Sequence, residues 1–336
     1  MQWLIDRRYN RQMRILITGG AGFIGSHLTD RLVADGHQIT VLDNLATGRK
    51  ENLTGHLDGS QVEFIEGSIL DLPLVDTLIK NSDYIFHLAA AVGVFNIVNH
   101  PLDSLMTNIR GTENVLESAN KHGKPVFVTS SSEVYGKNIS DSLRESDDRI
   151  LGAPITLRWS YSEAKAIDES LAYAYWVEKK LETRIVRFFN TVGPRQLGAY
   201  GMVVPRFVQA AIKNEPITIY GTGEQTRCFG HVYDAVDAVV KIAFADNTVA
   251  KVINIGNNFE ISINDLAKKV ISETNSKSEI VYVPYEEAYG DGFEDMERRV
   301  PNIELIKSLV GWEPQRNLST MITDIADFLK REHDSQ

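Results

Sequence analysis

The sequence contains one cysteine, Cys228, among its 336 residues. A single cysteine cannot form an internal disulfide, and it excludes a metal site built from several cysteines. The eight histidines show no ligand-like spacing along the chain. We therefore expect no bound metal.

Long apolar segments are also missing. The longest apolar run, residues 84–98, is interrupted by His87 and Asn96. It is shorter than the ~20 residues that a membrane-spanning helix needs. Residues 1–12 have arginines in their middle and no apolar core, unlike a signal peptide. We therefore expect a cytoplasmic protein with no membrane partner.

The chain has fewer basic than acidic residues, and its formal net charge at pH 7 is −10. Binding to nucleic acid requires a basic surface, so we expect no nucleic-acid partner. An anionic small molecule can still bind where a few arginines converge. Hydrophobic residues at 43% and charged residues at 24% are typical of a globular protein.

Apolar runs alternate with segments of helical periodicity along the first two thirds of the chain. The expected strands are residues 14–20, 37–44, 62–68, 83–90, 125–132 and 183–190. The expected helices are residues 21–36, 72–81, 108–123 and 160–182. This alternation predicts parallel strands with helices on both faces. The expected fold is α/β, a Rossmann-type doubly wound parallel sheet with a smaller α/β C-terminal substrate domain.

The rhythm changes near residue 193, where the chain becomes rich in glycine, proline and arginine. We expect an N-terminal extension over residues 1–12 and a dinucleotide-binding domain over 13–192, to which 233–257 return. Residues 193–232 and 258–330 would form the smaller domain.

Three glycines follow the first expected strand and open the first expected helix. Gly19, Gly22 and Gly25 are spaced by two residues each, one variant of the dinucleotide-binding fingerprint. Such glycines allow a tight turn, close approach to a pyrophosphate and close packing of helix on strand. The helix N-terminus adds backbone amides and a favourable dipole.

Asp43 ends the second expected strand, 18 residues after Gly25. A carboxylate at this point binds the ribose hydroxyls of NAD and repels the 2′-phosphate of NADP. The alternative is an aspartate that only forms a turn. We expect NAD as the cofactor.

Tyr161 and Lys165 are four residues apart on an expected helix, so their side chains share a face. A lysine cation lowers the pKa of a nearby phenol and makes it a usable base. Ser130 and Ser131 end the preceding strand, and Ser131 could hydrogen-bond the same substrate hydroxyl. The alternative is an exposed helix pair with turn serines.

Six motifs follow one another along the chain: "TGGAGFIGSHL", "LDNLATG", "SSSEVYG", "YSEAK", "RFFNTVGPRQ" and "YGTGEQTR". With them, the sequence resembles the extended short-chain dehydrogenases/reductases of the nucleotide-sugar epimerase/dehydratase family, over nearly the whole chain. The resemblance implies NAD, a nucleotide-sugar substrate, most often a UDP-sugar, and a homodimer formed through helix 160–182 and its neighbour.

The resemblance also implies contacts residue by residue. The implied NAD contacts are Gly19, Gly22, Phe23, Ile24, Gly25, Asp43, Asn44, Gly48, Ser68, Ile69, Leu88, Ala89, Ala90, Asn108 and Lys165. The implied substrate contacts are Ser132, Asn190, Arg195, Val204, Arg206, Ile219, Tyr220, Arg227 and Arg299. Among these, Arg227 would hold the diphosphate, and residues 216–220 would line the nucleobase pocket. Arg195 and Arg206 are equally compatible with ordinary ion pairs.

Four positions distinguish this chain within the family. Ser68 follows Gly67, where family members usually have an aspartate. Glu133 matches a glutamate of UDP-glucuronate decarboxylases and 4,6-dehydratases, whereas 4-epimerases commonly have a small neutral residue. Ser132 disfavours dehydration, because dehydratases place an aspartate there. Met202 stands where decarboxylases have an arginine, which disfavours a decarboxylase.

We expect an NAD-dependent UDP-hexose 4-epimerase that works through a transient 4-keto sugar, with Tyr161 as base, assisted by Lys165 and Ser131. Glu133 would accept a hydrogen bond from a 6-hydroxyl, act as a base, or only cap a loop amide. The alternative is a UDP-glucuronate decarboxylase or a nucleotide-sugar dehydratase that uses Glu133. A more remote alternative is a non-catalytic NAD-sensing regulator, although such proteins usually lose the tyrosine–lysine pair.

Overall fold

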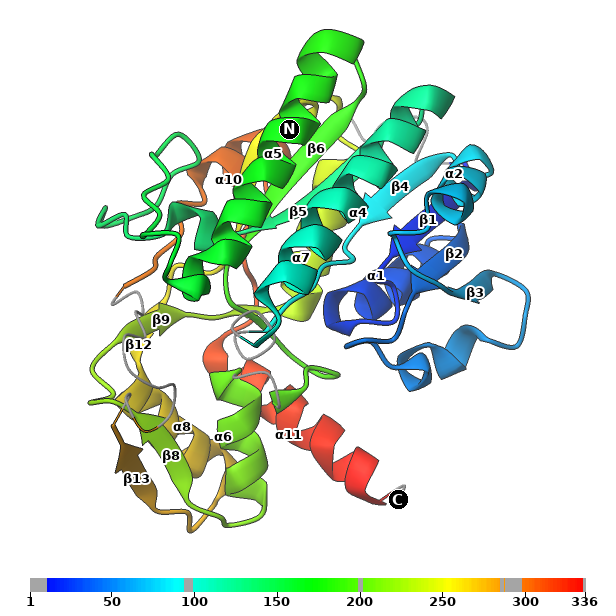
Figure 1. Ribbon diagram of the computed structural model, residues 1–336. Coiled ribbons are helices and arrows are strands. Elements are labelled where there is room, and N and C mark those ends of the chain that lie inside the picture. The colour runs from blue at the N-terminus through cyan, green and yellow to red at the C-terminus, as the bar shows by residue number, and fades with distance from the viewer. Residues whose placement is uncertain (1–10, 94–98, 199–201, 285–286, 288–297, 335–336) are drawn as a thin grey trace.

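The computed structural model describes residues 11–93, 99–198, 202–284, 287 and 298–334 (Figure 1). Most of the expected N-terminal extension lies outside these residues. In Figure 1 a large sheet layered between helices lies above a smaller group of helices and short strands.

Seven strands form the large sheet in the order β11-β6-β5-β4-β1-β2-β3, and every pairing is parallel. The strands are β1 (Arg14–Thr18), β2 (Gln38–Asp43), β3 (Val62–Glu66), β4 (Tyr84–His87), β5 (Val126–Ser131), β6 (Thr183–Phe188) and β11 (Val252–Ile255). The chain order reverses at β1, which lies between β2 and β4. In such sheets ligands bind at the carboxyl ends of the strands beside this reversal. The predicted fold class is confirmed.

Both faces of the sheet are covered. One face carries α1 (Phe23–Ala34), α7 (Val232–Ala243) and α10 (Glu304–Val310). The other carries α2 (Leu72–Lys80), α4 (Pro101–His122) and α5 (Ser160–Lys179). Strand β1 shows how the alternation of side chains serves both layers, since Ile15 and Ile17 pack with the first group and Leu16 with the second.

The smaller part has its own core, built from α6 (Val203–Ile212), α8 (Ile263–Thr274) and α11 (Leu318–Asp334). Its strands form two pairs, β8 (Ile217–Tyr220) with β13 (Ile280–Val283) and β9 (Thr226–Cys228) with β12 (Glu260–Ser262). A short pair, β7 (Thr191–Val192) with β10 (Gly230–His231), connects it to the sheet. The short 3₁₀ helices are η1 (Lys50–His56), η2 (Ser132–Tyr135), η3 (Leu157–Trp159) and η5 (Asp246–Thr248).

One stretch packs differently from the sequence expectation. Residues 258–330 were assigned to the smaller domain, but Ile303, Ile306, Val310 and Trp312 pack in the core under α1 and α7. These apolar side chains, from α10 and the residues next to it, are buried against the large sheet, although the chain around them belongs to the smaller part. The remaining domain boundaries stay predictions.

Within the described ranges, no helix is long and apolar enough to cross a membrane. The cytoplasmic location stays a prediction.

A buried ion pair fixes α5 on the sheet. The Arg187 guanidinium of β6 donates from Nε and one terminal nitrogen to the two oxygens of Glu169, each at 2.8 Å. Both side chains are 5% exposed. This fork-to-fork geometry is the strongest form of the pair.

We expect Glu169→Ala to lower the free energy of unfolding by about 3–5 kcal/mol, because it leaves a buried guanidinium without its carboxylate. Urea denaturation followed by circular dichroism measures this change. The control is Glu178→Ala, an exposed position on the same helix, with an expected change within about 0.5 kcal/mol. Equal losses in both variants would contradict the role given to the pair.

Candidate active site

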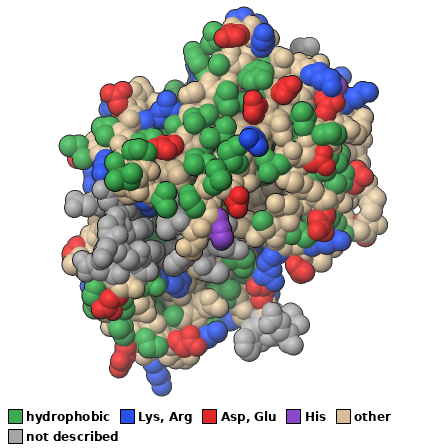
Figure 2. Space-filling model, viewed as in Figure 1, with side chains coloured by type: hydrophobic (Ala, Val, Ile, Leu, Met, Phe, Trp, Pro, Cys, Tyr) green, Lys and Arg blue, Asp and Glu red, His purple; other side chains and the backbone are tan. Residues whose placement is uncertain are grey.

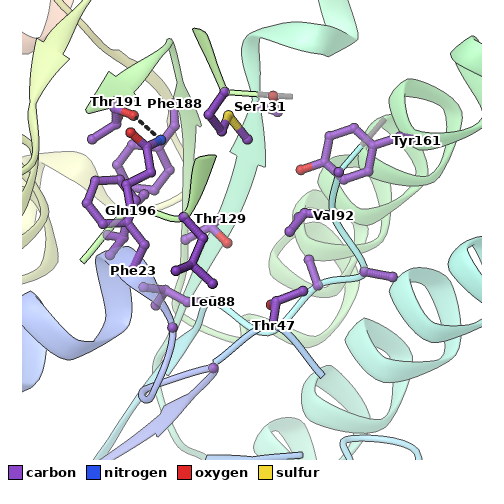
Figure 3. A pocket seen from close by; sticks show the side chains of 18 of the residues that line it. Phe23, Thr47, Leu88, Val92, Thr129, Ser131, Tyr161, Phe188, Thr191 and Gln196 are labelled. Atoms are coloured by element: carbon purple, nitrogen blue, oxygen red, sulfur yellow. Dashed lines mark hydrogen bonds between the residues drawn. The ribbon is translucent and has the colours of Figure 1, made fainter. Parts of the chain in front are cut away.

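A cavity of about 870 Å³ opens at the carboxyl ends of the large sheet and is lined by both parts of the chain (Figure 3). Most residues predicted from the sequence line it. They are Gly19, Gly22, Phe23, Ile24, Gly25, Asp43, Asn44, Ile69, Leu88, Ala89, Ala90, Ser131, Ser132, Glu133, Tyr161, Lys165, Asn190, Arg195, Val204, Arg206, Tyr220, Arg227 and Arg299. Its volume lies at the upper end of the range for ligand sites.

The glycine loop is packed too closely for side chains. A Cβ atom on Gly25 would lie 2.1 Å from the carbonyl oxygen of Gly19, and one on Gly19 would lie 2.7 Å from the Ala89 nitrogen. Gly19 also has a φ of +74°, in the left-handed region. The bare loop and the N-terminus of α1 border the cavity. This arrangement fits the pyrophosphate of a dinucleotide.

Asp43 braces this loop. Its Oδ2 accepts a hydrogen bond from the Ala21 amide at 3.0 Å, and its Oδ1 accepts one from the Leu45 amide at 2.9 Å. Burial raises the pKa of Asp43, and these backbone amides oppose that rise. Gly48 packs against the carboxylate, where a Cβ would lie 2.9 Å from each oxygen. The predicted contact of Asp43 with a ribose stays a prediction.

Four predicted contact residues do not line the cavity: Gly48, Ser68, Asn108 and Ile219. The Ile219 side chain is fully buried in the core of the smaller part. The Ser68 hydroxyl accepts a hydrogen bond from the Leu70 amide, and the Asn108 side chain bonds the backbone of Ala91 at 2.7 and 3.2 Å. Asn108 therefore acts through a loop that itself borders the cavity.

The predicted catalytic residues Tyr161, Lys165 and Ser131 line the same cavity. Tyr161 lies in the first turn of α5, Lys165 lies one turn later, and Ser131 ends β5. The Ser131 hydroxyl lowers the pKa of Tyr161 and accepts a hydrogen bond from the Glu133 amide at 3.2 Å. In Figure 3 both side chains extend into the same cavity, with Val92 beside them. The Lys165 ammonium donates to the Thr129 carbonyl at 2.9 Å.

The pKa of Tyr161 is raised above its ordinary value. Burial is the largest cause, and the negative charge of Glu133 acts in the same direction. The Lys165 cation and the Ser131 hydroxyl lower it. The predicted effect of the lysine is therefore present, but in this structure burial outweighs it.

Glu133 lies in η2 between two guanidinium groups. Its Oε1 accepts from Arg299 and its Oε2 from Arg158, each at 2.6 Å. Burial alone would raise the pKa of Glu133, but Arg299 and Arg158 hold it far below its ordinary value. Arg299 also donates to the Ser132 hydroxyl at 3.1 Å. Glu133 is thus a firmly ionised carboxylate and a weak base, and its oxygens accept from arginines rather than from a loop amide of the described residues.

Sequence reasoning missed Arg158. It lies three residues before Tyr161, in η3, and its side chain is 8% exposed. No spacing rule identifies it, because its carboxylate partner is 25 residues away in sequence. Its position just before the tyrosine–lysine helix was the available signal.

At the predicted diphosphate end, Asn190 and Arg227 come from neighbouring segments. The Asn190 amide donates to the Cys228 carbonyl at 3.1 Å, and Arg227 donates to the Thr226 carbonyl at 2.8 Å. Both side chains line the cavity.

Arg195 and Arg206 each have a structural partner as well as a place in the lining. Arg195 pairs with Asp30 at 2.8 Å and has a φ of +68°. The Arg206 guanidinium lies 4.3 Å from the centre of the Tyr220 ring and donates to the Thr218 carbonyl. Their predicted contacts with substrate stay predictions.

Comparisons with known proteins agree with this geometry. The profile of the NAD dependent epimerase/dehydratase family matches residues 15–256. The chain belongs to this family, as the sequence resemblance predicts, and is therefore an enzyme of the NAD-dependent nucleotide-sugar epimerase/dehydratase group.

Two curated relatives of this chain are decarboxylases. The chain is 41% identical to UDP-N-acetyl-alpha-D-glucosaminuronate decarboxylase of Bacillus cytotoxicus over 90% of this chain and 92% of the relative. It is 37% identical to UDP-glucuronic acid decarboxylase 1 of Xenopus tropicalis over 96% of this chain and 73% of the relative. A solved structure of UDP-glucuronic acid 4-epimerase from Bacillus cereus, in complex with UDP-glucuronic acid and NAD, is also similar. Its TM-score is 0.85 at 26% identity, over 95% of this chain and 100% of that one.

We expect Gly25→Ala to weaken NAD binding at least tenfold, because the new methyl group must displace the Gly19 carbonyl and with it the amides that face the pyrophosphate. Isothermal titration of NAD into protein freed of cofactor measures the affinity. The control is Gly55→Ala, whose Cβ would meet nothing within 4 Å. Unchanged affinity in a folded Gly25→Ala variant would contradict the proposed cradle.

Proposed function

We propose that this enzyme decarboxylates a UDP-hexuronate, with UDP-glucuronate and its 2-acetamido analogue as candidate substrates. The sequence alone favours a UDP-hexose 4-epimerase, with decarboxylation as the alternative. The names of the curated relatives at 41% and 37% identity support that alternative.

The observation that carries the proposal is a pair of buried guanidinium groups beside the catalytic tyrosine. Arg158 and Arg299 both line the cavity with Tyr161. Arg299 is 6% exposed, and its Nε has no hydrogen-bond acceptor among the described residues. A planar guanidinium in such a place suits a carboxylate, which it can bind with two parallel hydrogen bonds. A hexuronate supplies this carboxylate at C6, whereas a neutral hexose has a hydroxymethyl group there.

The glycine loop with Gly19, Gly22 and Gly25 would hold the pyrophosphate of NAD, and Lys165 would lie near its reactive end. Bound in this place, NAD would supply hydride transfer from and back to C4 of the sugar.

Tyr161 would carry the proton chemistry at C4. In its phenolate form it takes the proton of the 4-hydroxyl, and it returns a proton to O4 when the product is reduced. Ser131 would donate a hydrogen bond to the same oxygen. This hydrogen bond also stabilises the negative charge that gathers on O4 when the C5–C6 bond breaks and its electron pair moves toward O4. A proton from water would then add to C5 and restore the ketone at C4.

Glu133 would help the carboxylate to leave. A 4-keto hexuronate is a β-keto acid, and loss of CO₂ turns its C6 carboxylate into a neutral molecule. Glu133 is held ionised by its two arginines, so its charge disfavours the carboxylate relative to neutral CO₂. Arg299 would hold that carboxylate in place until the bond breaks.

Two further residues bear on the alternatives. Ser132 is buried and accepts a hydrogen bond from Arg299, so it offers no acid for the loss of water from C6. Met202, which counted against a decarboxylase in the sequence, lines the cavity and is 38% exposed.

The test is a panel of UDP-glucuronate, UDP-N-acetylglucosaminuronate, UDP-glucose and UDP-N-acetylglucosamine, each incubated separately with the purified protein. We expect loss of one CO₂ from a uronate and formation of a UDP-pentose, followed by proton NMR and mass spectrometry. A 4-epimer of unchanged mass as the sole product would overturn the proposal in favour of the epimerase.

The variant Glu133→Gln separates the two steps. We expect it to slow CO₂ release about 10²-fold while NADH absorbance still appears with a uronate, since oxidation at C4 does not need Glu133. The control is Glu163→Gln, on α5 but outside the lining of the cavity, with no change expected. Equal slowing of both steps would contradict the role given to Glu133.

We also infer a homodimer through α4 and α5. Ile167, Tyr173 and Val177 of α5 and Leu102 of α4 are exposed, and Figure 2 shows hydrophobic side chains gathered on this face of the molecule. An exposed apolar patch of this kind favours a protein contact. Light scattering after gel filtration should give twice the chain mass, and Tyr173→Glu with Val177→Glu should give a monomer. A wild-type monomer would exclude the dimer.

A further inference from the structure

A buried carboxylate lies directly behind the catalytic lysine. Asp168 is on α5, three residues after Lys165, and is fully buried. The Lys165 ammonium donates to Asp168 Oδ2 at 3.1 Å and to the Thr129 carbonyl at 2.9 Å. Asp168 is absent from the lining of the cavity, so it touches neither substrate nor cofactor. The mechanism given above makes no use of it.

A chain of buried hydrogen bonds runs from the cavity floor to Thr112 of α4. The Ala89 amide donates to the Thr18 hydroxyl at 3.3 Å, and this hydroxyl lies 2.8 Å from Nδ1 of His87. Nε2 of His87 lies 3.1 Å from the Thr112 hydroxyl. Thr112 in turn favours the charged form of Asp168, although Oδ1 of Asp168 has no hydrogen-bond partner among the described residues.

His87 links the two threonine hydroxyls of this chain. The Ala89 amide donates to the Thr18 hydroxyl, which keeps one proton and one lone pair for its bond to Nδ1 of His87. The tautomer of His87 sets which partner donates in its bonds to Thr18 and Thr112. Burial lowers the pKa of His87 to about 3, so its ring is neutral. A neutral ring adds no positive charge beside Lys165 and Asp168, and the Thr112 hydroxyl favours the charged form of the carboxylate.

Burial raises the pKa of the Asp168 carboxylate, and Lys165 is the main group that opposes this rise. Burial alone would lower the pKa of Lys165, but Asp168 and Tyr161 raise it above its ordinary value. The ammonium therefore stays charged, and its position is set by Asp168 on one side and the Thr129 carbonyl on the other.

The Asp168 carboxylate also limits how far the Lys165 ammonium lowers the pKa of Tyr161. Asp168 and Glu133 both raise the pKa of Tyr161, whereas Lys165 lowers it. Glu169 is a further charged group that acts on Lys165 and raises its pKa.

The remaining groups packed around α5 do not change this balance. Glu169 forms ion pairs with Arg187 of β6 and, at 3.6 Å, with Arg149. His87 of β4 is neutral. Asp168 is therefore the group on α5 that reduces the field of the ammonium at the catalytic hydroxyl.

We propose that Asp168 is a positioning residue for the reaction: it holds the Lys165 ammonium in place and keeps part of its charge from Tyr161. This inference rests on the proposed use of Tyr161 as base. A purely structural Asp168 would only tie α5 to α4 and β5.

The deciding measurement is the titration of Tyr161 in the protein with its cofactor and without sugar. Tyrosine labelled with ¹³C in the ring is followed by NMR against pH, and Tyr161→Phe assigns the signal. We expect Asp168→Asn, which keeps the shape and removes the charge, to lower the pKa of Tyr161 by about one unit. The acidic limb of the pH profile of kcat should shift to lower pH by the same amount, with KM unchanged.

The matched control is Thr112→Val, which removes a hydroxyl from the buried chain and keeps the charge of Asp168. We expect a lower melting temperature in both variants and a shift of the Tyr161 titration in Asp168→Asn alone. A folded Asp168→Asn protein with an unshifted tyrosine would overturn the proposal, as would an equal shift in Thr112→Val.

A measurement on the unaltered protein covers the case in which Asp168→Asn does not fold. ¹⁵N spectra of lysine ammonium groups, assigned with Lys165→Arg, should show a charged and slowly exchanging Lys165 throughout the neutral range. A neutral or freely exchanging amine would overturn the proposal. Because the NMR titration and these spectra need no sugar, they separate a failure of this inference from a failure of the decarboxylase assignment.

Discussion

The carboxylate of Glu133 holds together the reacting end of the cavity. It is bound from two directions, by Arg158 just before α5 and by Arg299 in the segment that precedes α10. Both guanidiniums are buried, so loss of the carboxylate would leave two cations without their shared counter-charge. The cluster therefore joins the end of β5, the start of α5 and the returning C-terminal segment around the place where the sugar would react.

The parallel sheet supplies the frame for this cluster. Parallel strands point their carboxyl ends to one edge, so the residues after β1, β4, β5 and β6 meet at a single cavity. Helix α5 is then fixed by two buried ion pairs, Lys165 with Asp168 and Glu169 with Arg187. Because these pairs set the rotation of the helix, Tyr161 faces the cavity next to Ser131.

Two kinds of site residue were predicted with unequal success. The glycine loop and the tyrosine–lysine pair depend on short spacings within one turn or one helix, and they lie in the cavity as expected. Arg158 and Asp168 escaped prediction, since the first acts through a partner 25 residues away and the second carries no motif. Ile219 was misplaced for a related reason, because strand alternation turns its side chain into the core of the smaller part.

Local pattern was therefore sufficient for the α/β fold, the dinucleotide loop and the membership in the nucleotide-sugar enzymes. The periodicity of apolar residues and the conformational freedom of glycine act over a few residues and can be seen in the chain itself. The ionisation of Glu133, the raised pKa of Tyr161 and the buried lysine–aspartate pair depend on burial and on charges brought from distant segments. Arg299 meets Glu133 across 166 residues, and an electrostatic interaction of that kind exists only once the chain has folded.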